Sequence, residues 1–408
     1  MKKYFIASII LFFTSICIHA QSEKSDFGIT VSGFLKTDIM YDSRQTISLR
    51  EGHFLLYPSP ELFDINKSDI NAKPNFNTLS IQSRLTGKIT GPDAFGAKTS
   101  GQLEGEFFGT ADGDINGFRL RHAFLKMDWD NASLLVGQTW HPLFITELVP
   151  GTVSFNTGAP FNPFSRNPQV RFSVLYDNFK FMAAAVSQRD FQSNGPAGLS
   201  SSYLRNSVLP NLHAQIQYAS GGNIAGFAFD YKKITPRLVT AKNVSTDAAI
   251  SSFGTSVFFK LNLASVTFKT QGVYGGNLAD LMMLGGYAIK SVDTVSGVED
   301  YTELKSFSVW CDISTGKEIE LGLFGGYSKS LGASDNIVGS SYGRGTNIEN
   351  IFRVSPRIQF NSGKTRISTE LEYTSAGYGT ADNADKAKIK NITTVVNIRL
   401  LVACYYFF

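Results

Sequence analysis

Beyond its first twenty residues the sequence has no apolar run long enough to form a transmembrane helix. The opening segment starts with two lysines, continues with an apolar stretch over 4–18, and reaches the small residue Ala20. This pattern predicts an exported protein in which 1–20 is a signal peptide and 21–408 is the mature domain.

Cysteine is also scarce, with three in the whole chain. Of these, Cys311 and Cys404 fall on apolar strand faces of the expected mature domain, so we expect free thiols rather than a disulfide-stapled scaffold. Neither charge sign is in excess. The 38 basic residues less Lys2 and Lys3 leave 36 against 34 acidic residues, a formal charge of +2. This near balance gives no reason to expect a nucleic-acid partner.

The sequence has no glycine-rich phosphate loop and no His-Glu-x-x-His. The mature histidines are scattered at His53, His122, His141 and His213. We therefore expect no enzyme, no cofactor and no metal site. One alternative is kept open. Alternation with Leu120 and Phe124 places His122 on the outer face, where it could serve a lipid hydrolase.

What the chain does contain is aromatic residues and glycine, with 33 Phe, 16 Tyr and 37 Gly, in segments of alternating polarity. In the first segment the apolar residues Ile29, Val31, Gly33, Leu35, Ile39 and Tyr41 alternate with the polar residues Thr30, Ser32, Lys36 and Asp38. Alternation of this kind predicts β-strands with one apolar and one polar face. About ten such residues suffice to cross a membrane in a β-barrel.

Short and long connections between these segments alternate along the chain. The short ones lie near 91–93, 130–131, 177–178, 221–223, 263–265, 315–317 and 361–363, and the long ones near 42–75, 109–117, 142–168, 188–211, 235–250, 275–302, 329–349 and 375–388. Seven short and eight long connections predict sixteen strands, or eighteen if 285–291 also pairs. The fold class expected is an all-β transmembrane antiparallel barrel, with short periplasmic turns and long extracellular loops.

The third long connection, over 142–168, is unusual in composition. It holds five of the 13 prolines and the aromatic residues Phe144, Phe155, Phe161 and Phe164. Proline blocks regular structure and phenylalanine favours burial, so we expect this loop to fold into the barrel and constrict it. A rigid extracellular cap or a subunit contact is the alternative.

Charged residues then become candidates for the wall of the constriction. They are Arg84, Arg119, Arg121 and Arg171 on the polar strand faces, with Glu147 and Arg166 on the loop. Guanidinium groups bind carboxylates and phosphates, so a row of arginines favours mild anion selectivity. Alternatively, the wall arginines pair with wall glutamates.

The last strand ends the chain with alternating apolar residues that include Tyr406 and Phe408. A terminal aromatic residue after such alternation resembles the signal by which the outer-membrane assembly machinery recognises its clients. We therefore expect Tyr406 and Phe408 to act as that assembly signal.

Two neighbouring motifs carry a family resemblance. Arg-His-Ala-Phe-Leu-Lys at 121–126, followed by Leu-Leu-Val-Gly-Gln-Thr-Trp at 134–140, is similar to a hairpin of Gram-negative trimeric porins, in particular the DcaP-like group. The resemblance implies a homotrimer in outer-membrane lipid that lets small polar, often anionic, solutes diffuse through. Some DcaP-like proteins have an N-terminal periplasmic coiled coil, which we do not expect here. A barrel that serves as the membrane partner of a surface complex is the alternative function.

Overall fold

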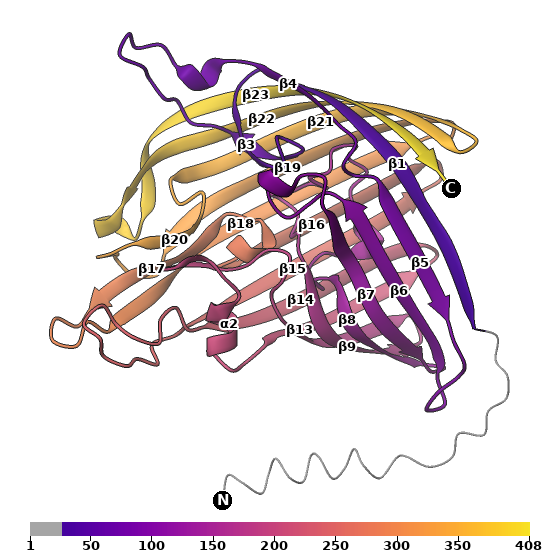
Figure 1. The fold of residues 1–408 in the computed structure, drawn as a ribbon, viewed down its shortest axis with the longest axis horizontal. Helices are drawn as coiled ribbons and strands as arrows, with labels where there is room; N and C mark the ends of the chain where they lie inside the picture. The colour runs from indigo at the N-terminus through magenta and orange to yellow at the C-terminus, as the bar shows by residue number, and fades with distance from the viewer. Residues whose placement is uncertain (1–26) are drawn as a thin grey trace, which may run out of the picture.

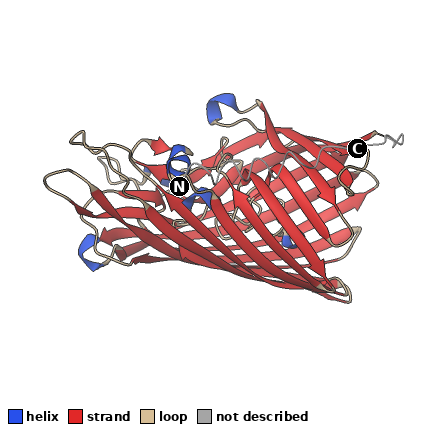
Figure 2. Cartoon of the chain, turned by 90° about the horizontal axis from the view of Figure 1, so that it is seen from below, coloured by secondary structure: helices blue, strands red, loops and turns tan. Residues whose placement is uncertain are grey.

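A computed structural model describes residues 27–408 of the chain as one antiparallel sheet that curls round and closes on itself (Figures 1 and 2). The expected signal peptide lies outside the described residues. The sheet has nineteen hydrogen-bonded segments. Of these, β4 and β5 make one interrupted strand beside β1, while β17 and β20 pair above the rim, which leaves sixteen strands around the barrel.

The barrel strands are β1 (Gly28–Asp42), β4 (Asn75–Leu79) with β5 (Arg84–Thr90), β6 (Lys98–Phe107), β7 (Phe118–Asp128), β8 (Ala132–Trp140), β9 (Arg166–Tyr176), β10 (Phe179–Val186), β13 (Asn211–Ser220), β14 (Asn223–Ile234), β15 (Ile250–Leu263), β16 (Val266–Gly276), β18 (Glu299–Thr315), β19 (Ile319–Ala333), β21 (Ile348–Ser362), β22 (Thr365–Asp382) and β23 (Lys388–Phe407). The prediction of sixteen strands is confirmed. The segment 285–291, whose pairing would have given eighteen strands, does form a strand, β17 (Gly285–Val292). It pairs with β18 and β20 (Ser341–Arg344) within the loops and does not cross the barrel.

Closure is made by the first and last strands. β1 pairs with β23 in register from Phe34 opposite Phe407 to Asp42 opposite Arg399. The backbone of Phe408 adds two further bonds, donating to the Gly33 oxygen at 3.1 Å and accepting from the Gly33 nitrogen at 3.2 Å. Within residues 27–408 the ladder therefore continues around the whole circumference, as a sheet in lipid must.

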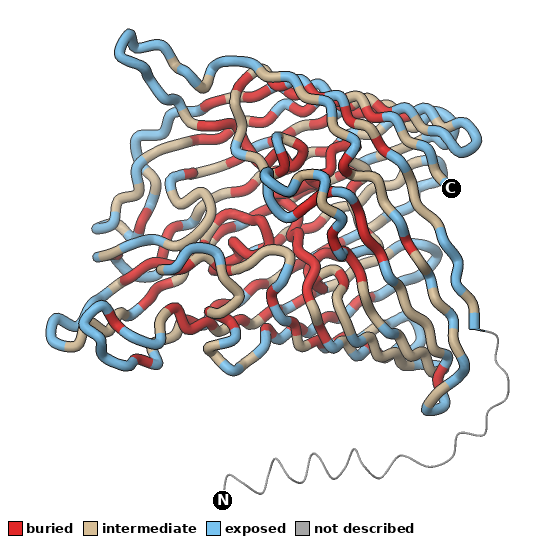
Figure 3. Tube along the Cα trace, viewed as in Figure 1, coloured by how far each residue is buried: buried red, intermediate tan, exposed pale blue. Residues whose placement is uncertain are grey.

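The polarity of the barrel is inverted relative to that of a water-soluble protein. On β22, Glu370 and Glu372 face inward and are 0% exposed, while Leu371 between them is 44% exposed on the outside. Buried and exposed residues also alternate along the other strands (Figure 3). The exposed ones are mostly apolar and the buried ones mostly polar, so the outer wall is apolar and the lumen wall is polar. In residues 27–408 no helix is long and apolar enough to cross a membrane.

Short turns lie at one end of the barrel and long loops at the other (Figure 1). β1 begins and β23 ends at the short-turn side. We number the long loops along the chain. Loop 1 (43–74) carries β2 (Thr46–Leu49), β3 (Phe54–Pro58) and η1 (Ile70–Ala72), loop 2 (108–117) carries η2 (Asp112–Asp114), and loop 3 (141–165) carries η3 (Thr146–Leu148). Loop 4 (187–210) carries β11 (Asn194–Gly195), β12 (Gly198–Leu199) and α2 (Ser202–Asn206), and loop 6 (277–298) carries η4 (Ala279–Leu281) and β17. Loop 7 (334–347) carries β20, and loop 8 (383–387) carries η5 (Asn383–Asp385).

The apolar core lies inside the barrel and is enclosed by its wall. It combines Phe54 and Leu56 of loop 1 with buried residues of loop 3 and loop 6, including Phe161 and Met283. These meet apolar wall residues such as Trp310. Residues of three loops therefore pack together inside the lumen.

Lipid exposure of the outer wall predicts a strong asymmetry between the two faces. We expect Leu371→Arg to lower the free energy of unfolding by about 2–4 kcal/mol if its position is near the bilayer centre. Ser100→Arg, on the lumen face, is the control and should change it by less than about 1 kcal/mol. Urea unfolding in lipid vesicles measures both. Equal losses would contradict the assignment of the faces.

Candidate functional site

Loop 3 (141–165) leaves β8, crosses the lumen and returns to β9. On the far wall Lys269 donates to the Val149 oxygen at 2.8 Å, and Ser308 donates to the Phe161 oxygen at 2.9 Å. Arg353 of β21 donates to the Ala159 oxygen at 2.8 Å. These bonds place the loop inside the barrel.

Apolar side chains explain why the loop folds inward. Leu148, Phe155, Phe161 and Phe164 are almost fully buried. The wall makes room for them: a Cβ at Gly326 would lie 2.5 Å from the Phe161 ring, which leaves space for glycine alone. Burial of each large apolar side chain stabilises the folded loop by roughly 1.5–3 kcal/mol.

Wall carboxylates fix the middle of the loop. Glu370 accepts the backbone N–H groups of Val153 and Ser154, the second at 3.2 Å. Glu372 accepts a bond from the Asn156 side-chain amide at 2.9 Å. An irregular loop cannot satisfy its own backbone donors, so these carboxylates replace the water that would otherwise do so.

Between loop 3 and strands β5 to β9, four predicted arginines meet around one carboxylate. Glu106 is 0% exposed, and its oxygens lie 2.6 Å from Arg121, 2.8 Å from Arg119 and 3.1 Å from Arg84. Arg166 approaches to 3.6 Å. We call these four arginines and Glu106 the arginine cluster. Sequence reasoning placed Arg166 on the loop, but it is the first residue of β9, opposite Trp140.

Two more carboxylates complete the charge balance. Glu104 lies 2.7 Å from Arg121, and Asp190 of loop 4 (187–210) lies 3.0 Å from Arg119 and 2.7 Å from Arg166. Four arginines against three carboxylates leave a net charge of +1. The alternative that wall arginines pair with wall glutamates is therefore correct for this cluster. Burial tends to raise the pKa of Asp190, but Arg166 and Arg119 outweigh it and hold that pKa below its usual range.

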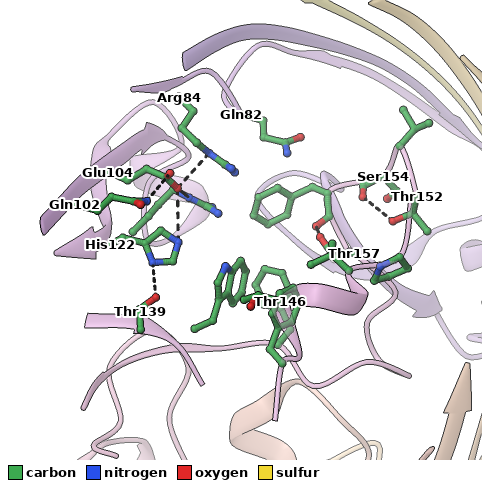
Figure 4. A pocket seen from close by; sticks show the side chains of 18 of the residues that line it. Gln82, Arg84, Gln102, Glu104, His122, Thr139, Thr146, Thr152, Ser154 and Thr157 are labelled. Carbon is green, nitrogen blue, oxygen red and sulfur yellow. Dashed lines mark hydrogen bonds and ion pairs between the residues drawn. The ribbon is translucent and has the colours of Figure 1, made fainter. Parts of the chain in front are cut away.

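His122 does not point outward, so that prediction was wrong. Glu104 pairs with His122 while Gly105 pairs with Leu120, which makes Arg121 the extra residue of a β-bulge. The bulge reverses the alternation, and Arg121 and His122 both turn into the lumen. His122 is buried there, its Nδ1 3.1 Å from the Thr139 hydroxyl (Figure 4).

Two cavities flank the cluster. The inner cavity, of about 500 Å³, lies between loop 3 and the wall, where Arg84, Glu104 and His122 face Thr146 and Thr157 of the loop (Figure 4). The outer cavity, of about 520 Å³, lies among loops 1, 2, 4 and 7 and reaches Arg119 and Asp190. The cluster therefore stands between a space open to the loops and a space deeper in the barrel.

The other two predicted site residues lie elsewhere in the lumen. Glu147 lies 3.4 Å from Lys180 of β10. Burial raises the pKa of Glu147, but Lys180 and local hydrogen bonds bring it below its usual value. Arg171 donates to the Trp140 oxygen at 2.7 Å and to Gln169 at 3.0 Å. Neither residue joins the arginine cluster.

Asp190 was not predicted from the sequence as a partner of the arginines. The carboxyl groups of β22 were not predicted as partners of loop 3. Asp190 sits in loop 4, outside any recognisable motif, and its contact with Arg119 spans 71 residues. No group of three or more His, Cys, Asp or Glu side chains within residues 27–408 is arranged to hold a metal ion.

No protein-family model and no curated protein sequence matches the chain. Solved structures match it over nearly its full length. The outer membrane channel DcaP of Acinetobacter baumannii superposes with a TM-score of 0.68 at 15% identity, covering 96% of this chain and 100% of that one. The chain has the porin fold. The resemblance expected from the hairpin motif is thereby confirmed at the level of the fold.

Other porin folds are more distant. The anion-selective porin from Comamonas acidovorans has a TM-score of 0.55 at 12% identity, covering 94% of this chain and 100% of that one. A trimer form of OmpT, an outer membrane protein of Vibrio cholerae, has a TM-score of 0.54 at 11% identity, with 94% and 100% covered. This porin fold thus tolerates nearly complete change of sequence while its barrel is retained.

The central position of Glu106 predicts a large stability effect. Glu106→Gln would leave four guanidinium groups around a neutral amide, so we expect the free energy of unfolding to fall by about 3–5 kcal/mol. Glu320→Gln is the control. Glu320 also faces the lumen, but it is partly exposed and 3.7 Å from Arg357, so a loss under about 1 kcal/mol is expected. Similar losses in urea unfolding would show that Glu106 is not the centre of the network.

Proposed function

We propose that this chain is an outer-membrane porin through which small polar solutes diffuse passively. The observation that carries the proposal is a closed sixteen-stranded barrel with an apolar outer wall and a polar lumen, into which loop 3 folds. We propose that this loop constricts the pore. The loop packs on the wall formed by β16 to β22 and leaves its opposite side to the arginine cluster and the two cavities. Solutes would pass on this side.

The location, the assembly and the oligomeric state of the channel are part of the same proposal. The charged start and apolar run of 1–20 support export, and the apolar belt supports insertion into outer-membrane lipid. Tyr406 and Phe408 lie at the closing seam, both partly exposed on the outside, where an assembly machinery could recognise them. A homotrimer is supported by the trimer form of one structural neighbour.

A mild preference for anions is the proposed selectivity. The cluster together with Glu104 and Asp190 has a net charge of +1. Arg84 is the most exposed of its arginines, with 20% of its side chain exposed, and it lines the inner cavity. A weak positive excess attracts anions without trapping them. Pore-lining roles are proposed for Arg84, Arg119, Arg121, Arg166, Glu147 and Arg171.

The geometry of His122 bears on the hydrolase alternative. Its outward position was the reason for considering a lipid hydrolase, and the bulge removes that reason, because His122 faces Thr139 and Glu104 inside the barrel. A measurement of conductance distinguishes a porin from a barrel that serves as the partner of a surface complex.

Single-channel recording in a planar bilayer tests the porin function. We expect steady conductance without added substrate, steps in threes, and an anion-selective reversal potential in a salt gradient. Silence in verified insertions would overturn the porin function, and a co-purifying protein would then favour a surface complex.

Arg84→Ser tests the path. Loss of this charge should lower the ratio of anion to cation permeability by about two- to fivefold, because a unit charge at ~4 Å in water contributes about 1 kcal/mol. Arg237→Ser is the matched control, since Arg237 pairs with Glu299 in the outer loops at 2.9 Å and lies outside both cavities. An equal effect of both variants would show that the ions pass elsewhere.

A further inference from the structure

Loop 1 folds into the lumen together with loop 3. Its strands β2 and β3 form a hairpin over 46–58, which we call the inner hairpin. Phe54 and Leu56 of this hairpin are 0% exposed. Arg353 of β21 donates to the Leu56 oxygen at 2.7 Å, and the same guanidinium group donates to the Ala159 oxygen of loop 3 at 2.8 Å. One wall side chain therefore binds the backbones of both loops.

Aromatic rings of the inner hairpin pack directly on loop 3. The ring centre of Phe54 lies 5.4 Å from that of Phe155, in the tip of loop 3 (153–155), and 4.9 Å from that of Phe164. The His53 ring lies 5.6 Å from Phe155. Buried rings at these separations are close-packed, so the tip of loop 3 cannot shift unless the inner hairpin yields.

Two charged residues of the closing strand β1 bind the same two loops. Lys36 and Asp38 form an ion pair at 3.0 Å. Asp38 lies 3.0 Å from Nε2 of His53 in the inner hairpin, and Lys36 donates to the Val153 oxygen in the tip of loop 3 at 2.9 Å. The contact between the two loops is thus fixed to the wall at both β1 and β21.

The tip of loop 3 forms one side of the inner cavity. Val153, Phe155 and Phe164 line that cavity, whereas none of the described residues of loop 1 lines it. The inner hairpin instead reaches the outer cavity with Leu49, followed by Arg50. A change in the inner hairpin would therefore alter the inner cavity through loop 3.

Loop 3 needs such a support because it lies across a lumen too wide for wall side chains to fill. Bonds to β16, β18 and β21 hold its far side, whereas the tip has the inner cavity beside it. Protein interiors are close-packed, so loss of a ring behind the tip leaves a space that neighbouring side chains partly enter. Movement of the tip into this space would widen the inner cavity.

We propose that the inner hairpin of loop 1 is a second constriction element, which sets the largest solute that passes by holding the tip of loop 3 in place. Phe54 is the positioning residue of this arrangement, because it lines neither cavity and acts through Phe155 and Phe164. The inference rests on the proposed porin function and adds the element that determines size selection. The contact controls size rather than charge, because the packed phenylalanine rings are neutral.

Phe54→Ala in the full-length protein tests the inference by liposome swelling with neutral sugars. Neutral probes are used because the arginine cluster acts on them weakly. We expect the permeation rate of raffinose relative to that of arabinose to rise about threefold, because a wider cavity favours the larger sugar. Phe54→Leu keeps a large apolar side chain and should retain the original ratio.

Phe258→Ala is the matched control. Phe258 is also 0% exposed in the same apolar core, but it lies on β15 over Gly226 and does not line the inner cavity. Its loss should destabilise the protein to a similar degree and leave the sugar ratio unchanged. An equal rise of the ratio in this variant would show that general loosening of the core sets the size limit, which would overturn the inference.

Tyr378→Phe keeps the test decisive if Phe54→Ala does not fold. It removes only the hydroxyl that donates to the Pro58 oxygen at 2.7 Å, so the apolar core stays intact. We expect a smaller rise of the ratio, about 1.5-fold. Tyr231→Phe, which loses a hydroxyl that bonds Ser251 at 2.9 Å, is its control and should leave the ratio unchanged.

The inference and the porin function fail in different ways. Sugar entry with an unchanged ratio in Phe54→Ala, or in Tyr378→Phe if Phe54→Ala does not fold, would overturn the second constriction and leave the porin function intact. No sugar entry through the unaltered protein would overturn the porin function. Faster amide hydrogen exchange at 153–155 in Phe54→Ala than in Phe258→Ala would still show that the inner hairpin holds the tip of loop 3, and equal exchange would overturn that as well.

Discussion

The rest of the structure depends on the requirement that a sheet in lipid must leave no backbone group unpaired. Water is absent from the hydrocarbon region, so each open N–H or C=O costs several kcal/mol there. The seam between β1 and β23, extended to the last residue by Phe408 and Gly33, meets this requirement. Once the sheet closes, the side chains have only two destinations, lipid or lumen, and the alternation along each strand decides between them.

A sixteen-stranded barrel then creates a second requirement, because its lumen is too wide for wall side chains to fill. The loops meet this requirement by folding into the lumen. Loop 3 brings phenylalanines that pack on Trp310 and Phe324, while Glu370 and Glu372 satisfy its backbone and amide groups. The loop is therefore held by apolar packing on one side and by hydrogen bonds to buried carboxyl groups on the other. The space that remains is asymmetric, and the arginine cluster lies along it.

Most of the fold could be predicted from the sequence because its dominant signal is local. Alternation shows which side of each strand meets lipid, and the lengths of connections show which end is extracellular. Local patterns cannot show where a β-bulge shifts the alternation between inward-facing and outward-facing residues. One extra residue, Arg121, turned His122 from the outer to the inner face. Likewise Pro168 suggested a loop, but it pairs with Gln138 close to the start of β9, where a missing donor is tolerated.

The sequence predicted the arginines of the candidate site and their possible pairing with wall glutamates, but not Asp190, and the reason is again physical. Arginines on polar strand faces are visible in the alternation, whereas Asp190 reaches them from a loop that has no regular pattern. The presence of Asp190 lowers the net charge of the site. Four arginines alone would form a trap for anions, and three carboxylates reduce the trap to a small positive excess. In a pore, a site must attract a solute enough to admit it and must still release it. A nearly balanced network of buried ion pairs suits both demands, because its positive excess is a single charge.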